Sequence, residues 1–113
     1  ALLRIENCTT YDLYDVRYGG SRFSDGSYRL PINEYDIRTF DSTRKEFITF
    51  EFGRSGYVKT KVRTAEKIIL KKGTALLITL TDTTMVVEDG KNTPVKHCIK
   101  TVSVSVARRR RLK

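Results

Sequence analysis

The chain has 113 residues and a formal net charge of +9, with 22 lysines and arginines against 13 acidic residues. This length predicts a single domain that buries roughly 65% of the surface exposed by the unfolded chain. Residues 108–113 hold five of the positive charges, so the rest carries only +4, which does not by itself indicate a nucleic-acid partner. No run of about 18 apolar residues occurs, which excludes a membrane-spanning helix within this sequence.

The composition and its periodicity favour β-strands. Valine, isoleucine, threonine, tyrosine and phenylalanine make up 42 residues, whereas alanine, the strongest helix former, occurs four times. Runs of alternating apolar and polar residues, the pattern of a half-buried strand, recur along the chain. They predict strands over residues 2–8, 11–18, 34–40, 46–52, 57–64, 68–70, 74–81, 85–88 and 95–106.

Within these strands the alternation predicts which side chains share a face. In the first strand it places Leu3 and Ile5 on one side. In the second it places Tyr14, Val16 and Tyr18 on one side, opposite Asp15 and Arg17.

Turn signals separate the strands. Gly19-Gly20 ends the second strand, because glycine adopts the positive φ angles of tight turns without a steric penalty. Pro31 keeps its segment out of the centre of a sheet, and the four residues 53–56, with glycine at both ends, are typical of a hairpin connection.

This order of short strands and turns, without helical periodicity, predicts an all-β fold. The expected architecture is an Ig-like antiparallel β-sandwich of about seven to nine strands over residues 1–107. We expect the basic residues 108–113 to form a disordered tail.

Cys8 and Cys98 lie near the two ends of this domain and admit one intramolecular pairing. A disulfide between them would close a loop of about 90 residues and stabilise the fold by about 4 to 5 kcal/mol in the chain-entropy model. Such a bond requires an oxidising compartment. The alternative is a pair of buried, reduced thiols in a cytosolic protein. A zinc site is not predicted, because His97 and Cys98 give at most two ligands and neighbours in a strand point to opposite faces.

A cationic stripe is the candidate binding site. Lys59, Lys61 and Arg63 share one parity of a predicted strand, and Arg54 lies in the adjoining turn. On an exposed face these side chains could hold a polyanion such as a phosphate polymer, a heparin-like sugar or an acidic polysaccharide. The alternative is a solvated face, since lysines on edge strands also prevent aggregation.

The first third of the chain interleaves tyrosines with arginines. This combination occurs in the stacking platforms of single-strand binders and in protein interfaces, although tyrosines also fill the margins of small cores. Together with the arginine run at 108–111, it supports an alternative function, a cytosolic OB-type barrel that binds single-stranded nucleic acid. The residues are Tyr11, Tyr14, Tyr18, Tyr28 and Tyr35 with Arg17, Arg22, Arg29 and Arg38.

No catalytic pattern is evident, and we predict that the protein is not an enzyme and uses no cofactor or metal. A hydrolytic triad would depend on His97, the single histidine, and the GxSxG segment of many hydrolases is missing. Carboxylate pairs such as Asp12 with Asp15 lie in turn-rich segments, where they more often cap turns than transfer protons. The triplet Asn7-Cys8-Thr9 matches the acceptor pattern for N-glycosylation.

Three parts of the chain resemble small extracytoplasmic bacterial β-sandwich modules: residues 4–20 (RIENCTTYDLYDVRYGG), Phe23, and residues 34–40 (EYDIRTF). Those modules often begin with an asparagine-and-threonine turn, followed by a strand of the pattern leucine-x-x-valine-x-aromatic-glycine and later by a glutamate-tyrosine pair. The resemblance implies an Ig-like architecture, export from the cytoplasm, and often lipid anchoring or surface display. It carries over no functional residue.

These features together predict a secreted, periplasmic or cell-surface binding module without catalytic activity. Its expected partner is a protein or a polyanionic ligand, with nucleic acid as the less favoured alternative. Contact with a membrane would occur only through an anchor outside this chain.

Overall fold

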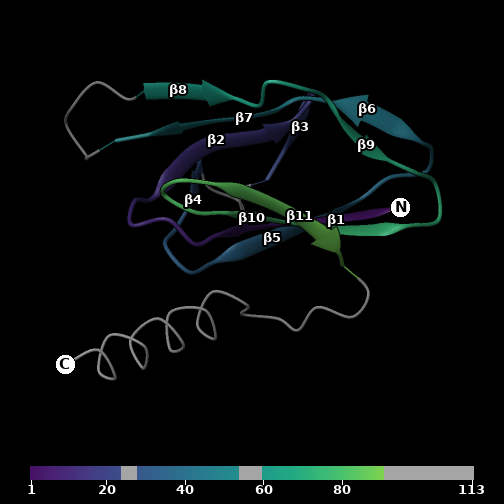
Figure 1. Ribbon diagram of the computed structural model, residues 1–113, viewed down its shortest axis with the longest axis horizontal. Helices are drawn as coiled ribbons and strands as arrows, with labels where there is room; N and C mark the ends of the chain where they lie inside the picture. Colours follow the sequence, from purple (N-terminus) through teal and green to yellow (C-terminus); the bar gives the residue numbers. More distant parts are fainter. Residues whose placement is uncertain (24–27, 54–59, 91–113) are drawn as a thin grey trace.

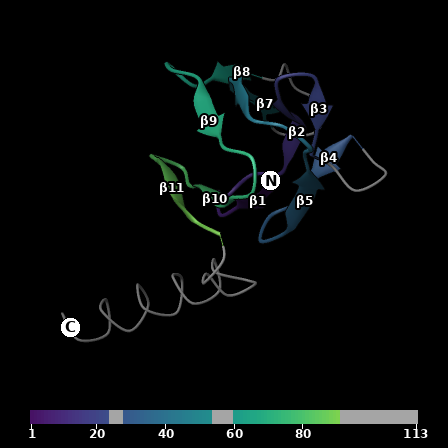
Figure 2. The same cartoon turned by 90° about the vertical axis from the view of Figure 1, so that its right-hand side faces the viewer.

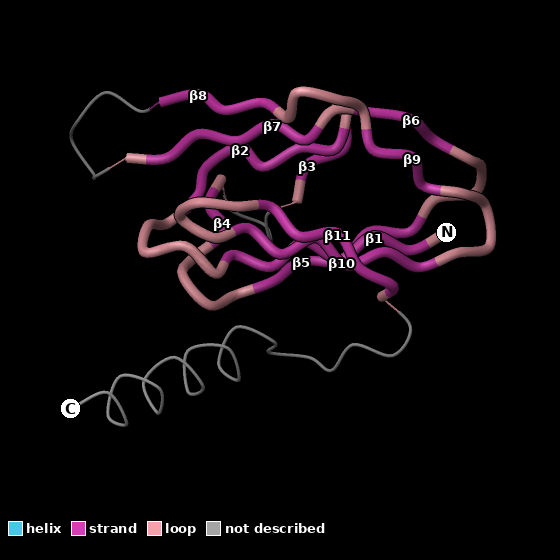
Figure 3. The backbone as a smooth tube through the Cα atoms, in the orientation of Figure 1, coloured by secondary structure: helices cyan, strands magenta, loops and turns pink. Residues whose placement is uncertain are grey.

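The computed structural model describes residues 1–23, 28–53 and 60–90. Within them all regular structure is β, and no helix occurs (Figure 3). The strands are β1 (Leu2–Asn7), β2 (Leu13–Tyr18), β3 (Ser21–Arg22), β4 (Arg29–Leu30), β5 (Tyr35–Thr39), β6 (Arg44–Glu46), β7 (Ile48–Phe52), β8 (Thr60–Arg63), β9 (Ile68–Leu70), β10 (Ala75–Leu80) and β11 (Met85–Asp89).

Two larger sheets face each other, and a smaller one lies at one end (Figure 1). The first sheet has the strand order β11-β10-β1-β5. The second has the order β3-β2-β7-β8, with β4 also paired to β2. The third sheet contains β6 and β9.

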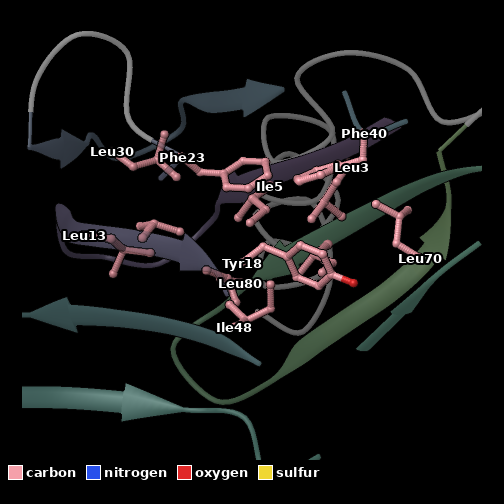
Figure 4. Packing of buried hydrophobic residues seen from close by; sticks show 12 residues of the cluster. Leu3, Ile5, Leu13, Tyr18, Phe23, Leu30, Phe40, Ile48, Leu70 and Leu80 are labelled. Carbon is pink, nitrogen blue, oxygen red and sulfur yellow. The ribbon is translucent and has the colours of Figure 1, made fainter. Parts of the chain in front are cut away.

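The hydrophobic core lies between the two larger sheets (Figure 4). Its side chains are almost fully buried, and burial of each aliphatic side chain stabilises the fold by about 1.5 to 3 kcal/mol relative to exposure. This contact therefore holds the two sheets together. Among the contributors are Leu3, Ile5, Ile78 and Leu80 from the first sheet and Leu13, Val16, Tyr18 and Ile48 from the second.

The all-β prediction is confirmed, but two details of the predicted sandwich are wrong. β1 pairs in parallel with β10, with Ile5 beside Ile78, so the pairing is not wholly antiparallel. Alternation shows which side chains share a face, but it carries no information about which strand lies alongside. The described residues alone hold eleven strands, more than the predicted seven to nine, because β3, β4 and β6 are too short to produce a periodic pattern.

β2 contains a bulge that the alternation does not reveal. Tyr14 pairs with Glu51 and Arg17 pairs with Thr49, so β2 has one residue more than β7 between these pairs. Asp15 in this stretch has a φ of 48°, a left-handed conformation that aspartate tolerates better than most residues. Val16 and Tyr18 share one side of the strand, as predicted, and that side faces the core. The predicted face of Tyr14 is wrong, because the bulge places it on the outer side with Arg17.

Asn7 ends β1 and is fully buried. Its side-chain amide donates hydrogen bonds to Tyr11 O and Leu30 O, both at 2.9 Å. Its Oδ1 accepts hydrogen bonds from the Thr9 N–H at 3.0 Å and the Thr9 hydroxyl at 2.6 Å. Asn7 thus joins the first sheet to the turn before β2 and to β4. The N-glycosylation suggested by the triplet is incompatible with this fold, because the side chain is buried and both amide hydrogens are used.

Several predictions fall outside the described residues. The strand predicted over 95–106 and the tail 108–113 are among them. Cys98 is another, so the disulfide with Cys8 stays a prediction.

We expect Asn7→Ala to lower the free energy of unfolding by about 2–4 kcal/mol, because buried polar groups of Thr9, Tyr11 and Leu30 would lose their partner. Urea denaturation followed by circular dichroism measures this change. Thr39→Ala, exposed at the end of β5, is the control and should stay within about 0.5 kcal/mol of the wild type. An Asn7→Ala variant as stable as this control would contradict the role assigned to Asn7.

Tyr18 connects the second sheet to the third. Its ring packs edge-on against Phe40 with 5.6 Å between centroids, and its hydroxyl donates a hydrogen bond to Ile68 O at 2.8 Å. Burial raises the pKa of Tyr18 above its ordinary value of 10.0. The pKa of Tyr18 is therefore higher in the folded protein than in the unfolded chain. Its contribution to the free energy of unfolding is complete at pH values below the unfolded pKa and is lost as the pH rises through the folded pKa.

We therefore expect Tyr18→Phe to be less stable than the wild type by about 1 kcal/mol near neutral pH, through loss of the hydrogen bond to Ile68. The variant should also lose less stability than the wild type between about pH 9 and about pH 12, because it has one titrating group fewer. Urea denaturation at a series of pH values tests both statements. Identical alkaline losses in the two proteins would show that Tyr18 does not titrate differently in the folded state.

Candidate functional site

A row of arginines crosses the outer side of the second sheet. The strand register pairs Arg22 with Arg17, Arg17 with Thr49, and Thr49 with Arg63. Paired residues point to the same side of a sheet, and neighbouring strands lie about 4.8 Å apart. Arg22, Arg17 and Arg63 therefore belong to one cross-strand row over β3, β2, β7 and β8, on the same side of the sheet.

Phe47 orients two of the cations on this side. The guanidinium carbon of Arg63 lies 4.4 Å from the centroid of the Phe47 ring, and the Lys67 ammonium nitrogen lies 5.6 Å from the same centroid. Cation–π contacts at exposed sites are worth about 0.5 to 1 kcal/mol each. The ring thus restricts where these two long side chains can place their charges.

Asp15 organises the other end of the row. Its Oδ1 lies 2.7 Å from Arg17 Nε and 3.4 Å from Arg22 Nε. Its backbone N–H donates a hydrogen bond to Tyr28 O at 3.0 Å, which helps to hold the left-handed conformation at this position. One carboxylate, presented by the bulge of β2, therefore sets the positions of two arginines.

A second row runs beside the first. Glu51 pairs with Tyr14 on one side and with Lys61 on the other. The Tyr28 hydroxyl donates a hydrogen bond to Glu51 Oε2 at 3.0 Å, and this bond raises the pKa of Tyr28 above its ordinary value. We call the outer side of the second sheet the cationic face. Among the described residues, the cations on this face include Arg17, Arg22, Lys61, Arg63 and Lys67, and the carboxylates include Asp15 and Glu51. Arg29 also lies on this side, as the pair of Tyr14, and its guanidinium is ion-paired with Asp12 at 3.3 Å.

The predicted binding residues are only partly within the described chain. Lys61 and Arg63 are exposed on β8 and share the cationic face, as the parity of the strand indicates. Arg54 and Lys59 lie outside the described residues. Arg17, Arg22 and Lys67 were not predicted to belong to this stripe, since only the strand register and the Phe47 ring bring them to it.

The structure separates the interleaved tyrosines and arginines. Tyr18 is buried in the core, and Arg4 rather than one of the interleaved arginines lies over the Tyr35 ring, with 5.9 Å to the centroid. Arg22 lies over the Tyr28 ring at 5.3 Å. The set therefore does not form one continuous stacking platform.

A groove of about 620 Å³ borders the cationic face along β8. Its volume is in the range of small-molecule sites. On one side the Thr10 N–H and hydroxyl donate hydrogen bonds to the Asp82 carboxylate, both at 2.8 Å, which fixes the turn between β10 and β11. Arg63 lines this groove as well as belonging to the cationic face. Among its apolar lining residues are Leu13, Phe50, Phe52, Val62, Leu80 and Met85.

Within residues 1–23, 28–53 and 60–90, no three His, Cys, Asp or Glu side chains are grouped so that they could hold a metal ion. These residues also contain no helix with the length and apolar character needed to cross a membrane.

No protein-family model, no curated protein and no solved structure matches this chain.

Proposed function

We propose that this chain is a binding module without catalytic activity, and that its cationic face holds an extended polyanion, a sulfated or carboxylated polysaccharide. The cross-strand row of Arg22, Arg17 and Arg63 is the observation that carries the proposal. A linear polymer with repeated negative groups can contact such a row at several points, and each contact releases a counterion.

Preorganisation of the cations supports this function. Arg63 is held against Phe47, and Asp15 holds Arg17 and Arg22, so these side chains lose less conformational freedom when a ligand binds. Guanidinium groups also form paired hydrogen bonds with carboxylate and phosphate oxygens, and sulfate offers the same arrangement of oxygens.

The aromatic rings on this side favour a polysaccharide over a single-stranded nucleic acid. Binding of single strands depends on open rings on which bases stack. Here Arg22 covers Tyr28, whose ring also lies 6.4 Å from that of Tyr14, and two cations cover Phe47. The described rings of the cationic face are therefore already occupied.

The proposed module is an Ig-like sandwich that works outside the cytoplasm, in the cell envelope or after secretion. The two facing sheets around one core support the architecture. The predicted pairing of Cys8 with Cys98 supports the oxidising compartment. A polysaccharide partner fits such a location.

Heparin is a suitable probe for this proposal, measured by isothermal titration calorimetry with the full chain. We expect Arg63→Gln to weaken binding about fivefold, equivalent to about 1 kcal/mol, because one charged contact is lost. The slope of log affinity against log salt concentration should become less steep by about one unit.

Two further variants make the test specific. Asp15→Asn should strengthen heparin binding, because it removes a negative charge that competes with the ligand while the asparagine Oδ1 can still accept the hydrogen bond from Arg17 Nε and keep this side chain oriented. Asparagine also tolerates the left-handed φ at this position. Lys71→Gln removes an exposed charge from the turn between β9 and β10 and is the control for charge loss alone. Residues 108–113 are present in every variant, so the differences between variants report on the cationic face.

Equal effects of Arg63→Gln and Lys71→Gln would contradict the proposed site. Tighter binding of an oligodeoxythymidylate than of heparin, weakened by Arg63→Gln, would instead support the nucleic-acid module.

A further inference from the structure

The core between the two larger sheets is less well covered at one end. Along β7 the alternation places Ile48, Phe50 and Phe52 on the inner side, where all three contact the core cluster. Ile48 is 0% exposed, whereas Phe50 and Phe52 are only half-buried. The cover over the inner side of β7 therefore decreases toward Phe52, and two inward-pointing aromatic side chains keep part of their surface accessible.

The groove that borders the cationic face lies at this place. Its floor includes Leu13 and Leu80, which are 1% and 2% exposed and belong to the core (Figure 4). Figure 2 shows β8 and β11, the edge strands of the two sheets, on the same side of the sandwich. Val62 from β8 and Met85 from β11 line the groove, and both are half-buried. The groove is thus an opening at the edge of the sandwich with an apolar floor and apolar walls.

Hydrogen bonds hold the walls of the groove in place. On one side, the bonds from Thr10 to the Asp82 carboxylate tie the turn between β10 and β11 to the turn before β2. On the other side, the Ile48 N–H donates to Thr64 Oγ1 at 3.2 Å, and the Thr64 N–H donates to Ile48 O at 3.0 Å. These two bonds fix the end of β8 against β7. The groove is therefore preformed, and a ligand does not have to order its walls.

Four threonines of the lining already have hydrogen-bonding partners. The Thr9 hydroxyl donates to Asn7 Oδ1 at 2.6 Å, and the Thr64 hydroxyl accepts the bond from Ile48. The hydroxyl oxygens of Thr81 and Thr84 lie 2.7 Å apart and are hydrogen-bonded to each other. A polar ligand would lose its bonds to water here and gain few in return, whereas an apolar ligand loses none. The lining therefore favours an apolar ligand.

The charges near the groove favour a neutral ligand. Asp82 and Glu66 line it, and both are exposed. The guanidinium of Arg63, which also lines it, lies over the Phe47 ring on the cationic face. The two carboxylates disfavour an anionic ligand, and the positive charge of the neighbouring cationic face disfavours a cationic one.

The aromatic side chains of the lining favour a ligand that contains rings. The Tyr11 and Phe52 rings lie 5.6 Å apart at an interplanar angle of 48°, and Phe50 and Met85 line the same groove. Aromatic rings pack well edge-on or offset against one another, and a thioether sulfur makes favourable contacts with them. A rigid ring also loses less conformational freedom on binding than a flexible chain. An apolar cavity of about 150 Å³ holds one benzene, so the 620 Å³ groove has room for a larger ligand of several rings.

We propose that this groove binds a neutral, apolar small molecule built of aromatic rings, at a site separate from the cationic face. The two sites lie on opposite sides of β8, because Val62 lines the groove while Lys61 and Arg63 point to the cationic face. The inference does not rest on polysaccharide binding, since its ligand is uncharged and contacts the inner side of the sheet.

N-phenyl-1-naphthylamine is a suitable probe, because it is neutral, contains three aromatic rings and fluoresces more strongly in an apolar environment. Titration of the full chain with this probe should show saturable binding of one molecule per chain. Naphthalene should displace the probe at a lower concentration than 1-decanol does. A saturating amount of heparin should leave the probe bound.

A pair of matched substitutions places the probe in the groove. Val62→Thr keeps the shape of the side chain but adds a hydroxyl to the apolar lining, so we expect the probe to bind about fivefold more weakly. Val86→Thr is the control, because Val86 is 40% exposed on β11 and does not line the groove; its affinity should stay within about twofold of the wild type. Circular dichroism verifies that both variants are folded.

The outcomes separate the alternatives. Absence of saturable binding to the wild type, or equal weakening by the two substitutions, would overturn the proposal. More effective displacement by 1-decanol would contradict a ring-containing ligand, and displacement by heparin would contradict two separate sites. Failure of heparin to bind while the probe still binds would count against the polysaccharide function alone. The wild-type titration decides whether a site exists even if Val62→Thr does not fold.

Discussion

The fold depends on what happens at the end of β1, where the chain passes from the first sheet to the second. A buried amide at that point is favourable only if its donors and its acceptor are used, and Asn7 satisfies them with groups from Thr9, Tyr11 and Leu30. These bonds fix the direction in which the chain enters β2 and hold β4 beside it. These bonds also fix the position of the two sheets relative to each other at the end of β1, so the sheets can pack against each other around a common core.

The bulge in β2 connects this framework to the cationic face. By adding a residue opposite β7 it turns Tyr14 outward with Arg17 and presents the Asp15 carboxylate between two arginines. Without it, Asp15 would not lie next to both guanidinium groups in the same row. A local departure from regular pairing therefore shapes the surface on which the proposed function rests, as bulges near binding sites often do.

The two large sheets have different outer sides for a physical reason. The second sheet is antiparallel throughout, and its outer side carries charged groups that remain solvated. The first contains the parallel β1–β10 pair, whose outer side includes Leu77 as well as charged groups that are buried. One sheet thus offers a charged surface to a ligand from outside the molecule, while the central strands of the other are closed to solvent on their outer side as well as toward the core.

The sequence by itself determined most of the longer described strands and which of their side chains share a face, because an alternating pattern reports a half-buried strand directly. Leu3 with Ile5, and Val16 with Tyr18, share a face as predicted, and that face is the core side. It also placed Lys61 and Arg63 together on an exposed face. It could not reveal the bulge at Asp15, the parallel neighbour of β1 or the addition of Arg17 and Arg22 to the stripe. Those features arise from the register between distant segments, which side-chain periodicity does not encode, so only the tertiary structure decided them.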